Sequence, residues 1–115
     1  MYAKLYRLIK SKENRGDFTY AEVTNKMFME AEKKLELIIP DAYKWFMSKF
    51  GHGGIGGIEV LGIGNNGRQF FVDTTIKYRN YGMPKNLIVI ENCDEWLYCI
   101  DSQNSKIVMW APGKR

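Results

Sequence analysis

The sequence of residues 38–57 is IIPDAYKWFMSKFGHGGIGG, an aromatic-rich helix signal that runs directly into a cluster of glycines. Pro40 predicts the start of a helix, because proline lacks the backbone N–H that a first turn leaves unpaired and its fixed φ suits that turn. Apolar residues then follow at the spacing of one helical face: Ala42, Tyr43, Phe46, Met47 and Phe50. Gly51 can adopt the left-handed conformation that ends a helix at low cost. The stretch therefore predicts a short helix with a fixed end, followed by a glycine-rich connection.

Two further helices are predicted before this stretch. Residues 2–11 carry Leu5, Leu8 and Ile9 at helical spacing, with basic residues between them on the solvent side. The polar segment 12–20 has no sustained period and is predicted to be a loop. Thr24 or Asn25 can cap a second helix that continues to about Leu37. The residues expected to face inward on this helix are Met27 or Phe28, Ala31, Leu35 and Ile38.

The second half of the chain predicts strands separated by turns. Residues 58–63 are a strand candidate that ends at an Asn-Gly turn, and a short helix is predicted from about Val72 to Tyr81. Three apolar runs joined by polar turns then predict an antiparallel meander, with the first run as a central strand: residues 87–90, 96–100 and 106–110. The predicted fold class is α+β, with N-terminal helices packed on one face of a mostly antiparallel sheet of about four strands.

Length and composition predict one globular domain over residues 1–115, with 45% hydrophobic residues available for a core. The net charge of +4 divides into +3 for residues 1–57 (10 basic, 7 acidic) and +1 for residues 58–115 (7 basic, 6 acidic). No run exceeds two adjacent basic residues, so the excess is expected to be spread out and direct nucleic-acid binding is not expected. No segment approaches the ~18 consecutive apolar residues of a membrane span, and no secretion signal is evident. We therefore expect a cytoplasmic protein without membrane attachment.

Two glycine patterns match the dinucleotide-binding spacing G-x-G-x-x-G. The first follows a helix and precedes a strand, the reverse of the required order; it consists of Gly51, Gly53 and Gly56. The second follows a predicted strand; it consists of Gly62, Gly64 and Gly67. Glu91 ends a later strand, where it could contact a ribose, but the chain beyond it is too short for the remaining parallel strands. A turn is therefore preferred for the second pattern, and nucleotide binding stays a minor alternative.

The sequence contains no recognisable catalytic or metal-binding arrangement. His52 is the single histidine and lies among glycines without a serine or cysteine motif beside it, so it is expected to be an exposed loop residue. One histidine and two cysteines are too few for a Cys and His metal site. Cys93 and Cys99 would lie ~20 Å apart along a predicted strand, beyond disulfide reach, and are expected to be buried free thiols. We expect no enzyme activity, no cofactor and no metal.

An aromatic group in the second half has the composition typical of the buried centre of a protein interface: Tyr78, Tyr81, Trp96, Tyr98 and Trp110, with Arg79 nearby. Strand alternation places Trp96, Tyr98 and Ile100 on one face of the sheet, and core packing is the alternative for Tyr98 and Trp110. Asp94 and Glu95 are expected in a solvated turn just before Trp96. The predicted partner-contact residues are Tyr78, Arg79, Tyr81, Asp94, Glu95 and Trp96.

The ordered motifs resemble those of the SUKH superfamily, the Smi/Knr-like domains, over about residues 20–111. The family signature has leucine or isoleucine before proline, then Tyr-Lys, Phe and Gly-Gly, and it matches residues 37–46 and 50–54. An aromatic-x-Tyr-Cys-Ile-Asp strand at residues 96–101 and a closing strand at 108–110 match later family segments. The positions of the motif that would have structural roles are Pro40, Tyr43, Phe46, Phe50, Gly51, Gly53, Gly54 and Asp101.

Among such proteins the chain resembles small bacterial members encoded beside polymorphic toxins of the LXG kind. The resemblance implies a non-enzymatic immunity protein that binds a cognate secreted toxin, often a nuclease, and blocks it in the cytoplasm. A general protein-interaction or small-ligand module is the alternative that other family members suggest. The C-terminal helix usual in the family does not follow the closing strand in this sequence, either because the domain lacks it or because the chain is shortened. In the first case a sheet edge or apolar groove is expected to be exposed, which favours self-association.

Overall fold

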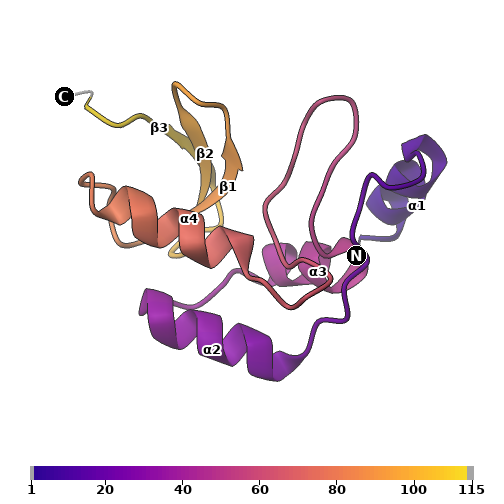
Figure 1. The fold of residues 1–115 in the computed structure, drawn as a ribbon, viewed down its shortest axis with the longest axis horizontal. Coiled ribbons are helices and arrows are strands. Elements are labelled where there is room, and N and C mark those ends of the chain that lie inside the picture. Colours follow the sequence, from indigo (N-terminus) through magenta and orange to yellow (C-terminus); the bar gives the residue numbers. More distant parts are fainter. Residues whose placement is uncertain (1, 114–115) are drawn as a thin grey trace.

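The structure is a computed structural model that describes residues 2–113. Within these residues, four helices precede a three-stranded antiparallel sheet (Figure 1). The helices are α1 (Ala3–Lys12), α2 (Asn25–Leu35), α3 (Asp41–Phe50) and α4 (Phe70–Arg79). The strands, in the spatial order β1-β2-β3, are β1 (Leu87–Asn92), β2 (Leu97–Asp101) and β3 (Ile107–Trp110). The predicted α+β class and the antiparallel meander are confirmed.

Helix α3 forms where the sequence predicts it. Pro40 is its N-cap, and Gly51 is its C-cap with a φ of +77°. On its inner face Tyr43 is buried, whereas Ala42, which the spacing also placed inward, is exposed. The Tyr43 hydroxyl donates a hydrogen bond to the carbonyl oxygen of Leu61, and burial raises the pKa of this hydroxyl well above its usual value. The helix is thereby attached to the segment that lies beyond the glycines.

The glycines after α3 let three backbone segments pass at close range. A Cβ atom added at Gly53 would lie 1.9 Å from the carbonyl oxygen of Asp17, and one at Gly54 would lie 1.6 Å from that of Ile58. Gly53 and Val60 exchange both of their backbone hydrogen bonds, at 3.1 and 2.9 Å. The Gly54 N–H donates to the Asp17 carbonyl at 3.1 Å. The motif glycines are therefore required because any side chain there would collide with neighbouring backbone.

Helix α2 begins as predicted, with the Thr24 side chain accepting a hydrogen bond from the Met27 N–H at 3.3 Å. It ends at Leu35, because Glu36 adopts a left-handed conformation with a φ of +56°. This break changes the direction of the chain before Ile38, so the prediction that Ile38 faces inward is wrong and its side chain is exposed. Helix α1 also forms as predicted, but it buries none of its residues completely.

The prediction of about four strands is wrong by one strand. The segment 58–63 forms only isolated bridges, because its hydrogen bonds are divided between the glycine connection and β1. One of these bonds, from the Leu61 N–H to the Ile90 carbonyl at 2.8 Å, lies on the outer edge of β1. Strand β1 therefore lies at the edge of the three-stranded sheet rather than at its centre, although it is shielded on that edge.

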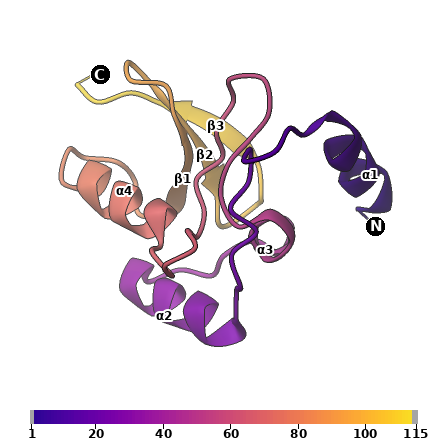
Figure 2. The same cartoon turned by 45° about the vertical axis from the view of Figure 1, so that its right-hand side comes forward.

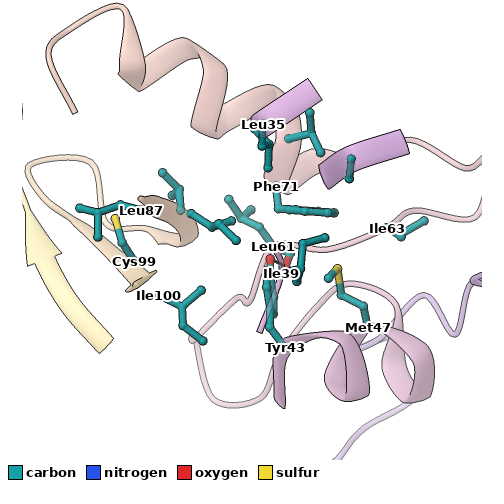
Figure 3. Packing of buried hydrophobic residues seen from close by; sticks show 14 of the residues in the cluster. Leu35, Ile39, Tyr43, Met47, Leu61, Ile63, Phe71, Leu87, Cys99 and Ile100 are labelled. Atoms are coloured by element: carbon teal, nitrogen blue, oxygen red, sulfur yellow. Dashed lines mark hydrogen bonds between the residues drawn. The ribbon is translucent and has the colours of Figure 1, made fainter. Parts of the chain in front are cut away.

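The helix that packs on the sheet is α4, and α2 packs in turn on α4. This arrangement differs from the prediction that the N-terminal helices cover the sheet, because the covering helix comes from the middle of the chain. Helix α4 begins two residues before its predicted start. Helix α1 lies at the far end of the molecule from the sheet in both views (Figures 1 and 2). One buried cluster joins α2, α3, α4 and the sheet, and Figure 3 shows Phe71, Tyr43 and Ile100 within it.

Asp101, the last motif position, organises the turn between β2 and β3. Its Oδ1 atom accepts a hydrogen bond from the Gln103 N–H at 2.9 Å. This bond, together with one from the Asn86 side chain, lowers the pKa of the Asp101 carboxyl below its usual value. The motif aspartate therefore has a structural role at the end of the strand.

Thr75→Val is expected to destabilise the protein by about 1–3 kcal/mol. Thr75 is completely buried, and its Oγ1 accepts a hydrogen bond from the Val89 N–H of β1 at 3.0 Å. Valine has nearly the same shape but would leave this buried donor without a partner. Urea unfolding followed by circular dichroism measures the change, with Thr74→Val on the half-buried neighbouring position as the control. If Thr75→Val and Thr74→Val lowered the free energy of unfolding equally, the hydrogen bond between Thr75 and Val89 would not be the cause of the loss.

Candidate partner-binding surface

One face of the sheet is covered at one end and open at the other. Cross-strand register aligns Ile88, Ile100 and Ile107 in one row, in which the first two residues are buried and Ile107 is exposed. The next row consists of Glu91, Tyr98 and Met109. We define the open face as four exposed side chains, with their exposed fractions: Trp96 (36%), Tyr98 (37%), Ile107 (56%) and Met109 (65%). No described part of the chain covers this apolar group completely.

The hairpin tip, defined as residues 91–96 at the end of β1 and in the turn before β2, positions Trp96 at the rim of the open face. The Asp94 N–H donates to Asn92 Oδ1 at 2.9 Å, and Asp94 has a left-handed φ of +66°. The Cys93 N–H donates to the Trp96 carbonyl at 2.9 Å and closes the turn. A cleft of about 450 Å³ lies beside it, lined by Glu95, Trp96, Met109 and Ala111. An indole and a carboxylate are therefore presented side by side at the rim of an apolar surface.

The predicted contact residues of α4 and the turn after it do not join this surface. Tyr78 is buried, and its ring packs edge-on against Trp110 with centroids 6.3 Å apart. The Arg79 guanidinium donates to the Lys85 carbonyl at 2.7 Å, and partial burial lowers its pKa. Tyr81 is exposed next to Tyr78. Because Trp110 pairs with Leu97, these residues lie toward the α4 side of the sheet, opposite the open face.

The structure thus brings together Asp94, Glu95 and Trp96, and it separates them from the predicted group on α4. Tyr98, for which core packing was an alternative, is exposed, whereas Trp110 is partly buried against the core. Sequence reasoning did not identify Ile107 and Met109 as part of the surface. The sequence indicates that Ile107 and Met109 lie on the same face of their strand, because they are two residues apart. Only the pairing of Tyr98 with Met109 shows that this is the open face of the sheet.

His52 is not the exposed loop residue that the sequence predicts. Its side chain is only 13% exposed, and its Nδ1 accepts a hydrogen bond from the Gly62 N–H at 3.0 Å. Its ring lies against Phe70, with centroids 4.5 Å apart, and its Nε2 is 3.5 Å from Glu59. These contacts give His52 a structural role in joining the glycine connection to the start of α4.

The second glycine pattern forms a turn whose amides are already occupied. The Gly64 N–H donates to the Arg68 carbonyl at 2.9 Å, and the Gly67 N–H donates to the Gly64 carbonyl at 2.9 Å. A phosphate cradle needs such N–H groups to point at the ligand. The turn interpretation therefore accounts for the pattern without a nucleotide.

The two cysteines are free thiols, as predicted. Cys99 is buried, and burial raises its pKa to about 12. Cys93 lies in the hairpin tip and is only partly buried, which differs from the prediction for this residue. Its pKa is raised by desolvation and by the nearby Glu91 and Asp94 carboxylates. Neither thiol has the lowered pKa of a reactive cysteine.

Among residues 2–113, no helix combines the length and apolar composition needed to cross a membrane. The same residues contain no cluster of three or more His, Cys, Asp or Glu side chains that could hold a metal ion.

One comparison with known proteins identifies the family, and another supports the fold. Residues 4–115 match the family model SUKH_5, described as "SMI1-KNR4 cell-wall". The fold is similar to a crystal structure of a protein from Pseudomonas syringae pv. tomato, with a TM-score of 0.78 and 16% sequence identity. That similarity covers 96% of this chain and 83% of the other. At this identity, the second match describes the fold alone.

Proposed function

This chain belongs to the SUKH_5 family of SMI1-KNR4 cell-wall proteins, and from that premise we propose that it is a non-enzymatic immunity protein. In this proposal the protein binds a cognate secreted toxin in the cytoplasm and blocks the toxin by covering the surface that contacts the toxin's substrate. The contact on this chain is the open face together with Asp94 and Glu95 of the hairpin tip. The observation that carries the proposal is an apolar surface, aligned by strand register, that the fold leaves uncovered.

The chemistry of the surface supports a protein partner. Tryptophan, tyrosine and methionine are enriched at protein interfaces, and a central aromatic anchor commonly contributes most of the binding energy. Tyr98 on β2 and Trp96 directly before this strand supply such anchors, and the carboxylates of Asp94 and Glu95 form a polar rim beside them. A toxin that acts on nucleic acid would present basic groups to this rim.

The test uses the C-terminal domain of the toxin that the proposal expects in the neighbouring gene, and the absence of such a gene would count against the proposal. Co-expression is expected to protect cells from that domain, and the two purified proteins are expected to form a complex at micromolar concentrations. Trp96→Ala is expected to weaken binding by about 30-fold or more, because it removes the aromatic anchor that lies between the open face and the two carboxylates of the hairpin tip. Isothermal titration calorimetry measures the dissociation constant.

Two methionines of similar exposure provide the matched control. Met109 on the open face is 65% exposed, and Met29 on α2 is 68% exposed. Met109→Ala is expected to weaken binding severalfold, whereas Met29→Ala should leave it unchanged. Absence of binding at micromolar concentrations would refute the immunity proposal. Binding that tolerates both Trp96→Ala and Met109→Ala would instead refute the assigned surface.

A further inference from the structure

The net positive charge is concentrated on α1, and the prediction of a spread excess is wrong. Residues 3–12 contain four basic residues and no acidic residue: Lys4, Arg7, Lys10 and Lys12. The rest of the chain has 17 − 4 = 13 basic residues and 13 acidic residues, so its net charge is zero. The net charges of the two chain halves do not reveal this concentration, because acidic residues that follow α1 within residues 1–57 offset part of its positive charge. Within residues 2–113, only Lys10 of the four forms an ion pair.

A hollow between α1 and α3 combines aromatic walls with two basic side chains, one from each helix, that form no ion pair within residues 2–113. This aromatic cleft has a volume of about 480 Å³ and is lined by Tyr2, Ala3, Tyr6, Arg7, Trp45 and Lys49. The Tyr2 and Trp45 rings lie 4.7 Å apart, and the buried Phe50 packs against Tyr6 and Trp45 from below. Arg7 and Lys49 are exposed at the rim. The cleft therefore has the chemistry to receive an aromatic side chain with a carboxylate beside it.

The hairpin tip has the complementary chemistry. It contains three carboxylates, at Glu91, Asp94 and Glu95, and no basic residue occurs between residues 86 and 105. Within residues 2–113 none of the three forms an ion pair. Trp96 is partly exposed directly after Glu95. One end of the molecule thus presents an indole beside carboxylates, and the other presents an aromatic cleft beside cations.

The two complementary features lie on separate parts of one molecule and do not meet in it. Both views show α1 at one end, with the glycine-rich connection standing between it and the β1–β2 hairpin (Figures 1 and 2). The chain extends 40 Å along its longest axis. The tip of one copy is therefore free to contact the cleft of another.

We propose that this protein self-associates head to tail, with the hairpin tip of one copy docked in the aromatic cleft between α1 and α3 of a second copy. Trp96 enters the cleft, and Glu95 faces Arg7 and Lys49 of the receiving copy. Because the two contacting surfaces differ, the interface is heterologous and produces short chains or a closed ring rather than a simple two-fold dimer. The inference goes beyond the proposed function, because it concerns only copies of this chain and its test needs no toxin.

Sedimentation velocity tests the proposal with the protein alone. The average sedimentation coefficient is expected to rise with protein concentration from ~10 μM to ~1 mM at about 50 mM NaCl. At about 500 mM NaCl the rise should be largely lost, because exposed charges are screened over a few ångströms.

Charge reversal at either end should abolish the association, lowering the association constant by at least about tenfold. The cleft variant carries Arg7→Glu and Lys49→Glu, and the tip variant carries Glu91→Lys and Glu95→Lys. Both leave Asp94 unchanged, because its left-handed φ disfavours most other residues. Each variant alone should remain monomeric. A one-to-one mixture of the cleft variant and the tip variant should associate again. Each contact between two different variants then joins a tip and a cleft of opposite charge.

The control variant carries Lys33→Glu and Lys34→Glu in the last turn of α2, which changes the net charge by the same amount as the cleft variant. It should associate like the unmodified protein. Circular dichroism confirms that each variant is folded before sedimentation. A monomer at ~1 mM in low salt would overturn the proposal. Association that persists in high salt and in both charge variants would also overturn it, and would indicate pairing through another surface, such as the outer edge of β3.

Discussion

Gly53→Ala is expected to destabilise the fold by about 3 kcal/mol or more. The added methyl group would lie 1.9 Å from the Asp17 carbonyl oxygen, a distance that no rotamer can relieve. Gly53 also has a φ of +133°, which L-residues rarely adopt. A backbone shift that removes this clash would break the two hydrogen bonds between Gly53 and Val60. Guanidinium unfolding, followed by circular dichroism, measures the loss.

The matched control for this substitution is Gly56→Ala. Gly56 lies in the same connection with a φ of +64°, but an added Cβ atom meets no other atom within 4 Å. Its substitution should therefore cost only the left-handed backbone penalty of about 1 kcal/mol. If the two variants lost the same stability, the close crossing of Gly53 and Asp17 would not be important for the fold.

Phe71→Ala is expected to lower the free energy of unfolding by about 3–5 kcal/mol. Phe71 is completely buried, and its ring packs edge-on against Tyr43 with centroids 5.5 Å apart. Figure 3 shows it between the helices and the extended segment that contains Leu61. Truncation would leave a cavity where α4 and α3 meet. Thermal and urea unfolding measure the loss.

Ile76→Ala on the same helix provides the comparison. Ile76 is exposed, so its loss should change stability by about 0.5 kcal/mol or less. A large loss of stability on Ile76→Ala would show that side-chain contacts on the exposed face also stabilise α4, because alanine has the higher helix propensity of the two residues. A small effect of Phe71→Ala would show that the core can collapse around the missing ring.

The elements that the sequence predicted well are those with strong local signals. Helix α3 is bounded by Pro40 and Gly51, and helix α2 begins at the cap Thr24. Residues 58–63 failed as a strand because apolar composition does not reveal whether a partner strand is available. The prediction that Ile38 faces inward was wrong because Glu36 has a left-handed conformation that ends the helix, and side-chain spacing alone does not show such a break.

The candidate surface was predicted only in part, for a similar reason. Asp94, Glu95 and Trp96 are adjacent in sequence, so their proximity was certain. Tyr78 was grouped with them by composition, but packing of α4 on the sheet buries it against Trp110. Met109 joins the surface through its register with Tyr98, which depends on the pairing of β2 with β3.

The sequence by itself determined the fold class, both ends of α3 and the family motif around residues 38–57, because caps, glycines and apolar periodicity act over a few residues. Only the tertiary structure decided which aromatic side chains are exposed, because exposure depends on what packs against each face. It also decided the role of the motif glycines, which permit contact between segments far apart in the chain. The charge difference between α1 and the hairpin tip was present in the sequence, but its significance depends on the distance that the fold places between them.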